Sequence, residues 1–232
     1  MILGGLQKIT LIDFPGKIAA TVFLSGCNFF CPWCYSPELV LSEKIKKQPK
    51  VSEKEFFDFL KSKQDLLEGI VICGGEPTLN EDLPEFIKKI KKMGYLVKLD
   101  TNGSNPKMLK SLIDKKLVDY VAMDIKTSKD NYLKVFGKKV KIKDIEKSVE
   151  VLKNSKIDSE FRTTVVPTIH TKEDFIKIAK WIGGKNIKYF FQNFRPEKTI
   201  DPEFKKIRPF PDEWLLNVKK EVSPFFKTCE IR

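Results

Sequence analysis

Three cysteines in one short stretch are the residues of this sequence best suited to chemistry. Cys27, Cys31 and Cys34 lie in the segment GCNFFCPWC and have the spacing Cys-x3-Cys-x2-Cys. Thiolates this close together on a loop can converge on one iron-sulfur cluster. Three ligands leave the fourth iron of a four-iron cube open. An open iron can bind a substrate, whereas a fully ligated cluster mainly transfers electrons.

A structural zinc site and coincidental buried cysteines are the competing interpretations of this stretch. Zinc in a structural site takes four ligands, and the one histidine of the sequence, His170, lies far along the chain. Cys73 is a conceivable fourth ligand, but it ends a predicted strand and is explained more simply as a small buried residue. Cys229 is predicted to be a free thiol. The sequence contains no second cysteine cluster, so auxiliary iron-sulfur clusters are not expected.

Composition indicates a globular chain without a membrane segment. The 232 residues include 43 Lys and Arg against 31 Asp and Glu, a net charge of +12. The lysines are scattered, which is typical of a solvated surface; a nucleic-acid partner is disfavoured, although the charge permits one. No apolar run approaches the ~20 residues that span a bilayer, and the start has no signal-peptide pattern. We expect a cytoplasmic protein without a membrane partner.

Six runs rich in β-branched and aromatic residues alternate with helical patterns and predict parallel strands. Ser52 with Glu55, and Thr171 with Asp174, have the pattern of helix starts. Six units are too few for a closed eight-stranded barrel. We therefore predict an α/β fold, a partial (β/α)6 TIM-like barrel in one domain (1–232), with the first ~18 residues and the tail from ~209, including a final helix, packed on it. The predicted strands are 19–25, 69–73, 95–100, 120–125, 161–166 and 189–194.

Polar residues follow three of these predicted strands. Gly74-Gly75-Glu76-Pro77 follows the second strand, Asp100-Thr101-Asn102-Gly103 ends the third, and Asp124-Ile125-Lys126 ends the fourth. Each segment alone is explained by a turn or a surface ion pair. Together they predict a shared rim, because parallel α/β folds place their active sites at the carboxyl ends of the strands.

The cysteine motif, with Trp33 before its last cysteine, resembles the signature of the radical S-adenosylmethionine (SAM) superfamily. The resemblance implies a 4Fe-4S cluster whose open iron is chelated by the amino and carboxylate groups of SAM. It also implies that the SAM adenine lies along Trp33, Cys34 and Tyr35. The segment Gly74, Gly75 and Glu76 resembles the family's GGE motif, which receives the SAM amino group.

Over nearly its whole length, including the opening GGLQKITLIDFPGK, the chain resembles activating enzymes of glycyl radical enzymes. The related activators act on pyruvate formate-lyase and anaerobic ribonucleotide reductase. The resemblance implies that Asp100, Asp124 and Lys126 lie at the SAM carboxylate and ribose. It also implies a monovalent cation site involving Asp100, Thr101 and Asp124. Further candidates for the same pocket are Asn102, Ile125, Arg162, Gln192 and Arg195. In the formate-lyase activator a histidine near the sixth strand contacts SAM, whereas here that stretch reads FQNFR.

The expected activity follows from this resemblance. The reduced cluster cleaves SAM to methionine and a 5′-deoxyadenosyl radical, which removes hydrogen from a backbone glycine of a partner glycyl radical enzyme. A low-potential donor such as flavodoxin or ferredoxin supplies the electron. One alternative keeps the radical chemistry but modifies RNA, a peptide or a small metabolite. The other alternative is a non-enzymatic iron-sulfur electron carrier, against which the open iron, GGEP and DTNG argue.

Overall fold

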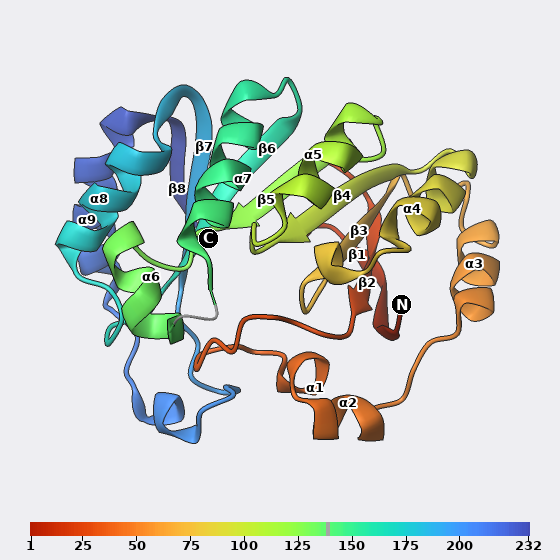
Figure 1. The fold of residues 1–232 in the computed structure, drawn as a ribbon, viewed down its shortest axis with the longest axis horizontal. Helices are drawn as coiled ribbons and strands as arrows, with labels where there is room; N and C mark the ends of the chain where they lie inside the picture. The colour runs from red at the N-terminus through yellow and green to blue at the C-terminus, as the bar shows by residue number, and fades with distance from the viewer. Residues whose placement is uncertain (138–139) are drawn as a thin grey trace. The chain divides into compact units, whose positions relative to one another are not determined.

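The computed structural model describes residues 1–137 and 140–232 (Figure 1). The strands within these ranges are β1 (Leu3–Thr10), β2 (Ala19–Leu24), β3 (Gly69–Gly74), β4 (Leu96–Thr101), β5 (Tyr120–Asp124), β6 (Asp158–Val165), β7 (Gly184–Asn193) and β8 (Phe226–Ile231). The helices are α1 (Pro37–Val40), α2 (Ser42–Lys47), α3 (Glu53–Lys61), α4 (Leu83–Lys92), α5 (Pro106–Asp114), α6 (Lys129–Phe136), α7 (Ile142–Asn154), α8 (Lys172–Ile182) and α9 (Asp212–Val222).

The strands are hydrogen-bonded in the same order as they occur in the chain, from β1 to β8. β1 is antiparallel to β2. The pairs β2–β3, β3–β4, β6–β7 and β7–β8 are parallel. Parallel neighbours that are consecutive in the chain require a crossover, and helices provide it here. The sheet is therefore mostly parallel, and within each unit the parallel strands end in the same direction.

The chain forms two compact units. The first unit comprises residues 1–28, 36–101 and 107–121, and contains β1 to β4. The second unit comprises residues 29–35, 102–106 and 122–232, and contains β6 to β8. β5 begins in the first unit and ends in the second. The motif residues are divided between these two units.

All six predicted strands are present, and the structure adds two that the pattern did not predict. β1 lies in the opening segment and β8 in the tail, where the sequence also predicted the helix that forms α9. β1 contains the pair Gly4-Gly5 near its start and has three exposed residues in succession. β8 contains one buried residue, Cys229. Neither segment therefore shows the apolar run or strict alternation that identifies a strand.

Two helices begin as the sequence predicts. At the start of α3, the Ser52 hydroxyl accepts a hydrogen bond from the Glu55 N–H, and the Ser52 N–H donates to the Glu55 carboxylate. Thr171 and Asp174 form the same capping box at the start of α8. These reciprocal bonds satisfy backbone donors that a helix start leaves open. The apolar face of α8, with Phe175 and Ile178, is fully buried, and α8 and α9 lie side by side next to β8 (Figure 1).

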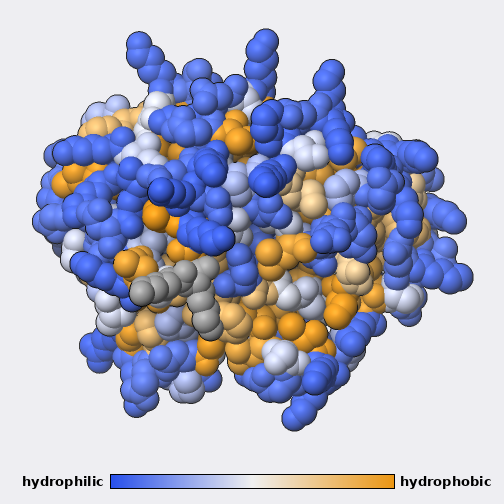
Figure 2. Space-filling view, viewed as in Figure 1, coloured by the Kyte–Doolittle hydropathy of each residue, from blue (hydrophilic) through white to orange (hydrophobic). Residues whose placement is uncertain are grey.

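The surface is dominated by polar and charged side chains. Figure 2 shows long hydrophilic side chains projecting over most of the visible face, with hydrophobic residues gathered in smaller areas between them. Among the described residues, no helix combines the length and apolar character required to cross a bilayer.

Candidate functional site

The cysteine segment begins directly after β2 with a glycine that turns the chain. Gly26 has a φ of +101°, a conformation that glycine adopts without strain, and its N–H donates to the Leu39 carbonyl at 2.7 Å. Cys27 follows and belongs to the first unit. Cys31 and Cys34 belong to the second unit, where the Cys34 N–H donates to the Cys31 carbonyl at 2.9 Å. This hydrogen bond closes a turn that holds the backbones of Cys31 and Cys34 near each other.

The donor chemistry of this segment fits an iron-sulfur cluster. Within the described residues no cysteine forms a disulfide bond. No three His, Cys, Asp or Glu side chains there are already gathered as a metal site. Burial raises the pKa of the Cys229 thiol to about 11, so this cysteine stays protonated and is a poor ligand. The donors that remain close in sequence are the three thiolates of one eight-residue segment, Cys27, Cys31 and Cys34. Three ligands are too few for a closed zinc site, which takes four.

The two glycines after β3 allow the loop to pack against the end of β2. A Cβ at Gly74 would lie 2.4 Å from the Leu24 carbonyl oxygen, and a Cβ at Gly75 would lie 2.0 Å from the Gly26 carbonyl oxygen. The N–H groups of Gly75 and Glu76 donate to those two carbonyls, each at 2.8 Å. Both positions therefore require glycine. In the structure they hold the GGE loop against the segment that leads into Cys27.

Glu76 is fully buried in the first unit and its carboxylate is held by two threonines. Its Oε1 accepts hydrogen bonds from the Thr78 N–H at 3.1 Å, from the Thr101 hydroxyl at 2.7 Å and from the Thr78 hydroxyl. A buried carboxylate needs such donors because burial without them is costly. Glu76 and Thr101, predicted from two separate motifs, are thus brought together by β3 and β4.

Asp100 has a partner, Lys98, that was not predicted from the sequence. The side chain of Lys98 forms an ion pair with Asp100 two residues further along β4. The Lys98 side chain is 1% exposed and that of Asp100 11%. Residues i and i+2 of a strand share a face, so this pair was geometrically foreseeable. A lysine in a strand, however, ordinarily indicates a solvent-facing position.

In the second unit, Asp124 lies between two cations. Its Oδ2 is 2.8 Å from the Lys126 ammonium and its Oδ1 is 2.9 Å from Arg162 Nε. Burial alone would raise the pKa of Asp124, but the positive charges of Arg162 and Lys126 lower it well below the usual range. Burial alone would likewise lower the pKa of Lys126, but Asp124 and the Cys31 thiolate raise it. The predicted residues Asp124, Lys126 and Arg162 therefore form one charged cluster. The cluster interacts electrostatically with Cys31 through Lys126.

His170 holds the backbone of Lys126 in place. Its Nδ1 accepts a hydrogen bond from the Val166 N–H at 3.0 Å. The other ring nitrogen, Nε2, therefore carries the proton and donates to the Lys126 carbonyl at 2.9 Å. The Tyr132 hydroxyl accepts from the Lys126 N–H at 2.9 Å. His170 is 2% exposed, so this histidine, which the sequence assigned to no specific role, is a structural support of the charged cluster.

Because of His170, we expect the free energy of unfolding to fall as the pH falls from about 6.5 to 4. Burial lowers the pKa of His170 from 6.5 to about 4. Between these values the unfolded chain binds a proton that the folded chain does not, so acid favours unfolding, by roughly 3 kcal/mol once both values are passed. Denaturant titrations at several pH values measure this loss. His170→Gln should flatten the dependence over this interval, and an unchanged pH slope in that variant would contradict the assignment.

The aromatic residues of the motif differ in exposure. Trp33 is 3% exposed and packs against Phe136 and Phe204, with ring centroids 5.8 and 6.2 Å away. Tyr35 is 36% exposed, and its hydroxyl accepts a hydrogen bond from the Arg195 N–H at 2.8 Å. Its ring stacks at 6.3 Å on Phe194. Tyr35 thus presents more accessible surface to a ligand than Trp33 does.

Three further predicted residues, Asn102, Ile125 and Gln192, lie in a turn or at strand ends of the second unit. The side chain of Asn102 accepts from the Ser104 N–H at 2.9 Å and so stabilises the turn after β4. Ile125 is fully buried, and its N–H donates to the Arg162 carbonyl at 2.8 Å. Gln192 pairs with Thr164 in the β6–β7 register. Ile125 and Gln192 thus help define the strand ends.

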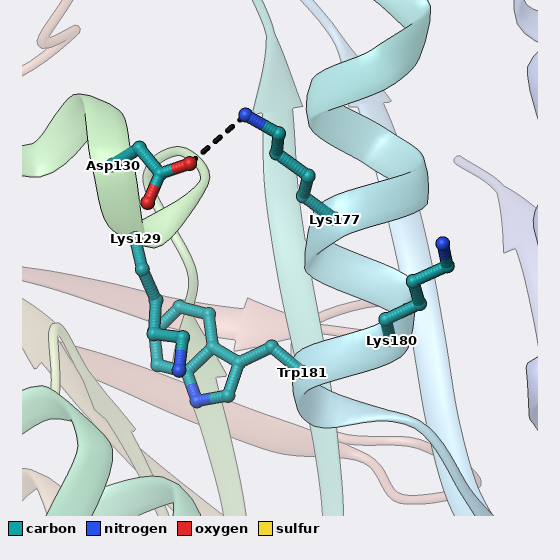
Figure 3. A pocket seen from close by; sticks show the side chains of 5 residues that line it. All are labelled: Lys129, Asp130, Lys177, Lys180 and Trp181. Atoms are coloured by element: carbon teal, nitrogen blue, oxygen red, sulfur yellow. Dashed lines mark hydrogen bonds and ion pairs between the residues drawn. The ribbon is translucent and has the colours of Figure 1, made fainter.

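A hollow on the outside of the second unit contains none of these residues. It has a volume of about 310 Å³ and lies between α6 and α8 (Figure 3). In this hollow Lys177 forms an ion pair with Asp130 at 2.9 Å, and the Lys129 ammonium lies 5.6 Å from the Trp181 ring centroid. The fifth lining residue is Lys180. The candidate site is therefore defined by the motif residues and not by this hollow.

Comparison with known proteins identifies the class of this chain. The radical SAM superfamily matches residues 21–182, and the chain belongs to this superfamily. A Methanocaldococcus jannaschii protein, whose name provisionally describes it as a glycyl-radical enzyme activating enzyme, is 37% identical over 221 residues. The match covers 91% of this chain and 87% of that protein. The family prediction is confirmed.

Two solved structures share the fold. Streptococcus suis SuiB matches with a TM-score of 0.65 at 16% identity, covering 91% of this chain and 48% of SuiB. The enzyme anSMEcpe, solved with bound AdoMet and a Cp18Cys peptide, matches with a TM-score of 0.62 at 18% identity. That match covers 91% of this chain and 62% of anSMEcpe. At this identity the likeness concerns the fold alone, and it confirms the predicted α/β fold with parallel strands, which is consistent with a partial barrel.

Proposed function

We propose that this chain is a radical SAM activating enzyme that generates a glycyl radical on a partner enzyme. The observation that carries this proposal is the match, over nearly the full length of both chains, to the Methanocaldococcus jannaschii relative described above. We further propose that residues 1–232 act as a single radical SAM domain. The partner is of the anaerobic ribonucleotide reductase or pyruvate formate-lyase type, and a flavodoxin or ferredoxin supplies the electron.

Cys27, Cys31 and Cys34 would hold the 4Fe-4S cluster. When bound and reduced, the cluster supplies one electron to the SAM sulfonium, which releases methionine and a 5′-deoxyadenosyl radical. The Lys126 ammonium, whose pKa the Cys31 and Cys34 thiolates raise, offsets part of the negative charge of these ligands. Because the cofactor performs the bond cleavage, the task of the protein is to bind, orient and shield SAM.

The charges of the site suit the ends of SAM. Asp124 carries one negative charge, and its partners Lys126 and Arg162 carry two positive charges. The net charge of +1 favours a carboxylate nearby, which is why we assign this cluster to the methionine carboxylate and the ribose. Glu76, together with Gly74 and Gly75, would accept the SAM amino group.

Stacking and additional polar contacts complete the proposed pocket. The more exposed ring of Tyr35 is the better platform for adenine, and Trp33 serves as a buried packing residue. The remaining proposed SAM contacts are Asp100, Thr101, Asn102, Ile125, Gln192 and Arg195.

The substrate assignment is supported by the relative's name and by the peptide in the anSMEcpe structure. A backbone glycine is small enough to approach a radical closely, since it has no Cβ. The 5′-deoxyadenosyl radical removes one Cα hydrogen atom, which gives 5′-deoxyadenosine and leaves the unpaired electron on the glycine.

An electron paramagnetic resonance experiment tests this assignment. The reconstituted full chain, SAM, dithionite and a candidate glycyl radical enzyme are mixed without oxygen, and we expect a glycine-centred doublet. The same partner with its radical glycine replaced by alanine should give no such signal. Abundant 5′-deoxyadenosine without any glycyl signal from either partner type would contradict the activating function and favour the alternative substrates, RNA, a peptide or a metabolite.

A further inference from the structure

A buried lysine occupies the place beside Asp100. Lys98 lies in the middle of β4, and its side chain is almost completely removed from solvent, with 1% exposed. Its ammonium forms an ion pair with the Asp100 carboxylate. An ammonium buried without a compensating charge would lose its proton or destabilise the fold. The Asp100 carboxylate therefore supplies the charge that allows Lys98 to be buried.

The resemblance to activating enzymes implies a different source of positive charge at this position. In that family Asp100 and Thr101 correspond to ligands of a monovalent cation. Here the Asp100 carboxylate already has a cation from the chain, and the Thr101 hydroxyl donates to Glu76 at 2.7 Å. Asp124, the third implied ligand, has both Lys126 and Arg162. The charge of the Asp100 carboxylate is thus already offset by Lys98, so Asp100 does not fit a site that requires an additional cation.

We propose that Lys98 supplies, from within the chain, the positive charge that a bound Na⁺ or K⁺ would bring to Asp100, and that this protein binds no monovalent cation there. A lysine ammonium is a compact single charge with three donors, so it can neutralise a carboxylate as an alkali ion does. A second cation beside Asp100 would be repelled by the positive charge of Lys98, most strongly in a site that is shielded from water. Only the placing of Asp100 beside SAM rests on the proposed function.

Thermal unfolding of the anaerobically reconstituted full chain tests this inference without SAM. Midpoints are compared in NaCl, KCl and choline chloride at equal ionic strength. For the wild type we expect the same midpoint in all three salts. Lys98→Met removes the Lys98 charge from beside Asp100, so we expect a lower midpoint in choline chloride that NaCl or KCl selectively and saturably raises. The double variant Lys98→Met/Asp100→Asn should lose this selectivity.

A lysine of the same unit provides the matched control. Lys91 pairs with Asp119 at 2.7 Å, but about 30% of each side chain is exposed, so water can solvate the carboxylate. Lys91→Met should therefore show no preference among the three salts. Selective stabilisation of the wild type by Na⁺ or K⁺, or indifference of folded Lys98→Met to the cation, would overturn the proposal. If Lys98→Met does not fold, the wild-type comparison decides alone.

SAM binding gives a second readout. The dissociation constant of the wild type for SAM should agree within about twofold among the three salts, whereas a gain of about tenfold in NaCl or KCl would overturn the inference. Absence of SAM binding in every salt would contradict the proposed function instead. The unfolding comparison would still decide the role of Lys98.

Discussion

Replacing Cys31 with serine removes both the iron-sulfur absorbance and the release of 5′-deoxyadenosine. A serine hydroxyl is not ionised at neutral pH and is a poor ligand for iron, so only two thiolates of the motif would remain. Loss of a ligand should exceed the 10–100-fold effect of removing a residue that merely supports one. We therefore expect SAM cleavage at background level. Anaerobic reconstitution followed by absorption spectra and product analysis measures both effects.

Cys229→Ser is the matched control for the cysteine variant. Cys229 is buried in β8, away in sequence from the motif, and its raised pKa keeps it a neutral thiol. The Cys229→Ser variant should assemble the cluster and cleave SAM as the wild type does. Wild-type iron content in Cys31→Ser, or loss of the cluster in Cys229→Ser, would contradict the assignment of the three ligands.

The second large effect concerns stability and the buried Glu160. Arg232 Nη1 and Nη2 lie 2.8 and 2.9 Å from the two oxygens of the Glu160 carboxylate. The Glu160 side chain is 0% exposed, and the Arg232 guanidinium lies 3.5 Å from the Phe190 ring centroid. Arg232→Met removes this cation from a buried carboxylate, and breaking a buried ion pair typically costs about 3–5 kcal/mol. We expect the lower end, because 38% of the Arg232 side chain is exposed.

Denaturant unfolding with a double-mutant cycle measures this contribution. Glu160→Met combined with Arg232→Met removes both charges and should recover much of the lost stability. The exposed pair of Lys206 and Glu203, at 2.8 Å with both side chains more than 70% exposed, provides the control. Lys206→Met should change the free energy of unfolding by less than about 1 kcal/mol. An equally small change for Arg232→Met would show that the buried pair is not stabilising.

Local patterns were sufficient to predict most of the fold. The fully buried strands, such as β3 with Ile70 to Ile72, produce uninterrupted apolar runs, and the capping boxes at Ser52 and Thr171 depend on residues three positions apart. β1 and β8 are edge segments whose pairing is decided by their neighbours, so their own residues contain little signal.

The cysteine motif could be predicted because its spacing lies within eight residues, whereas the partners of the site residues could not. The hydrogen bond between Glu76 and Thr101 joins residues 25 positions apart in the sequence, and the one between His170 and Lys126 joins residues 44 positions apart. Such contacts depend on how strands align, which no local pattern encodes. Lys98 was missed for another reason, because a lysine in a strand predicts exposure unless its burial is known.

If Cys27, Cys31 and Cys34 hold a cluster that cleaves SAM, the purified chain must form the products of that cleavage. The full chain is reconstituted anaerobically with iron and sulfide, reduced with dithionite and supplied with SAM, and the products are quantified by chromatography. We predict 5′-deoxyadenosine and methionine in equal amounts, both dependent on dithionite and on the cluster. A protein that carries the 4Fe-4S cluster but leaves SAM intact under these conditions would contradict the account.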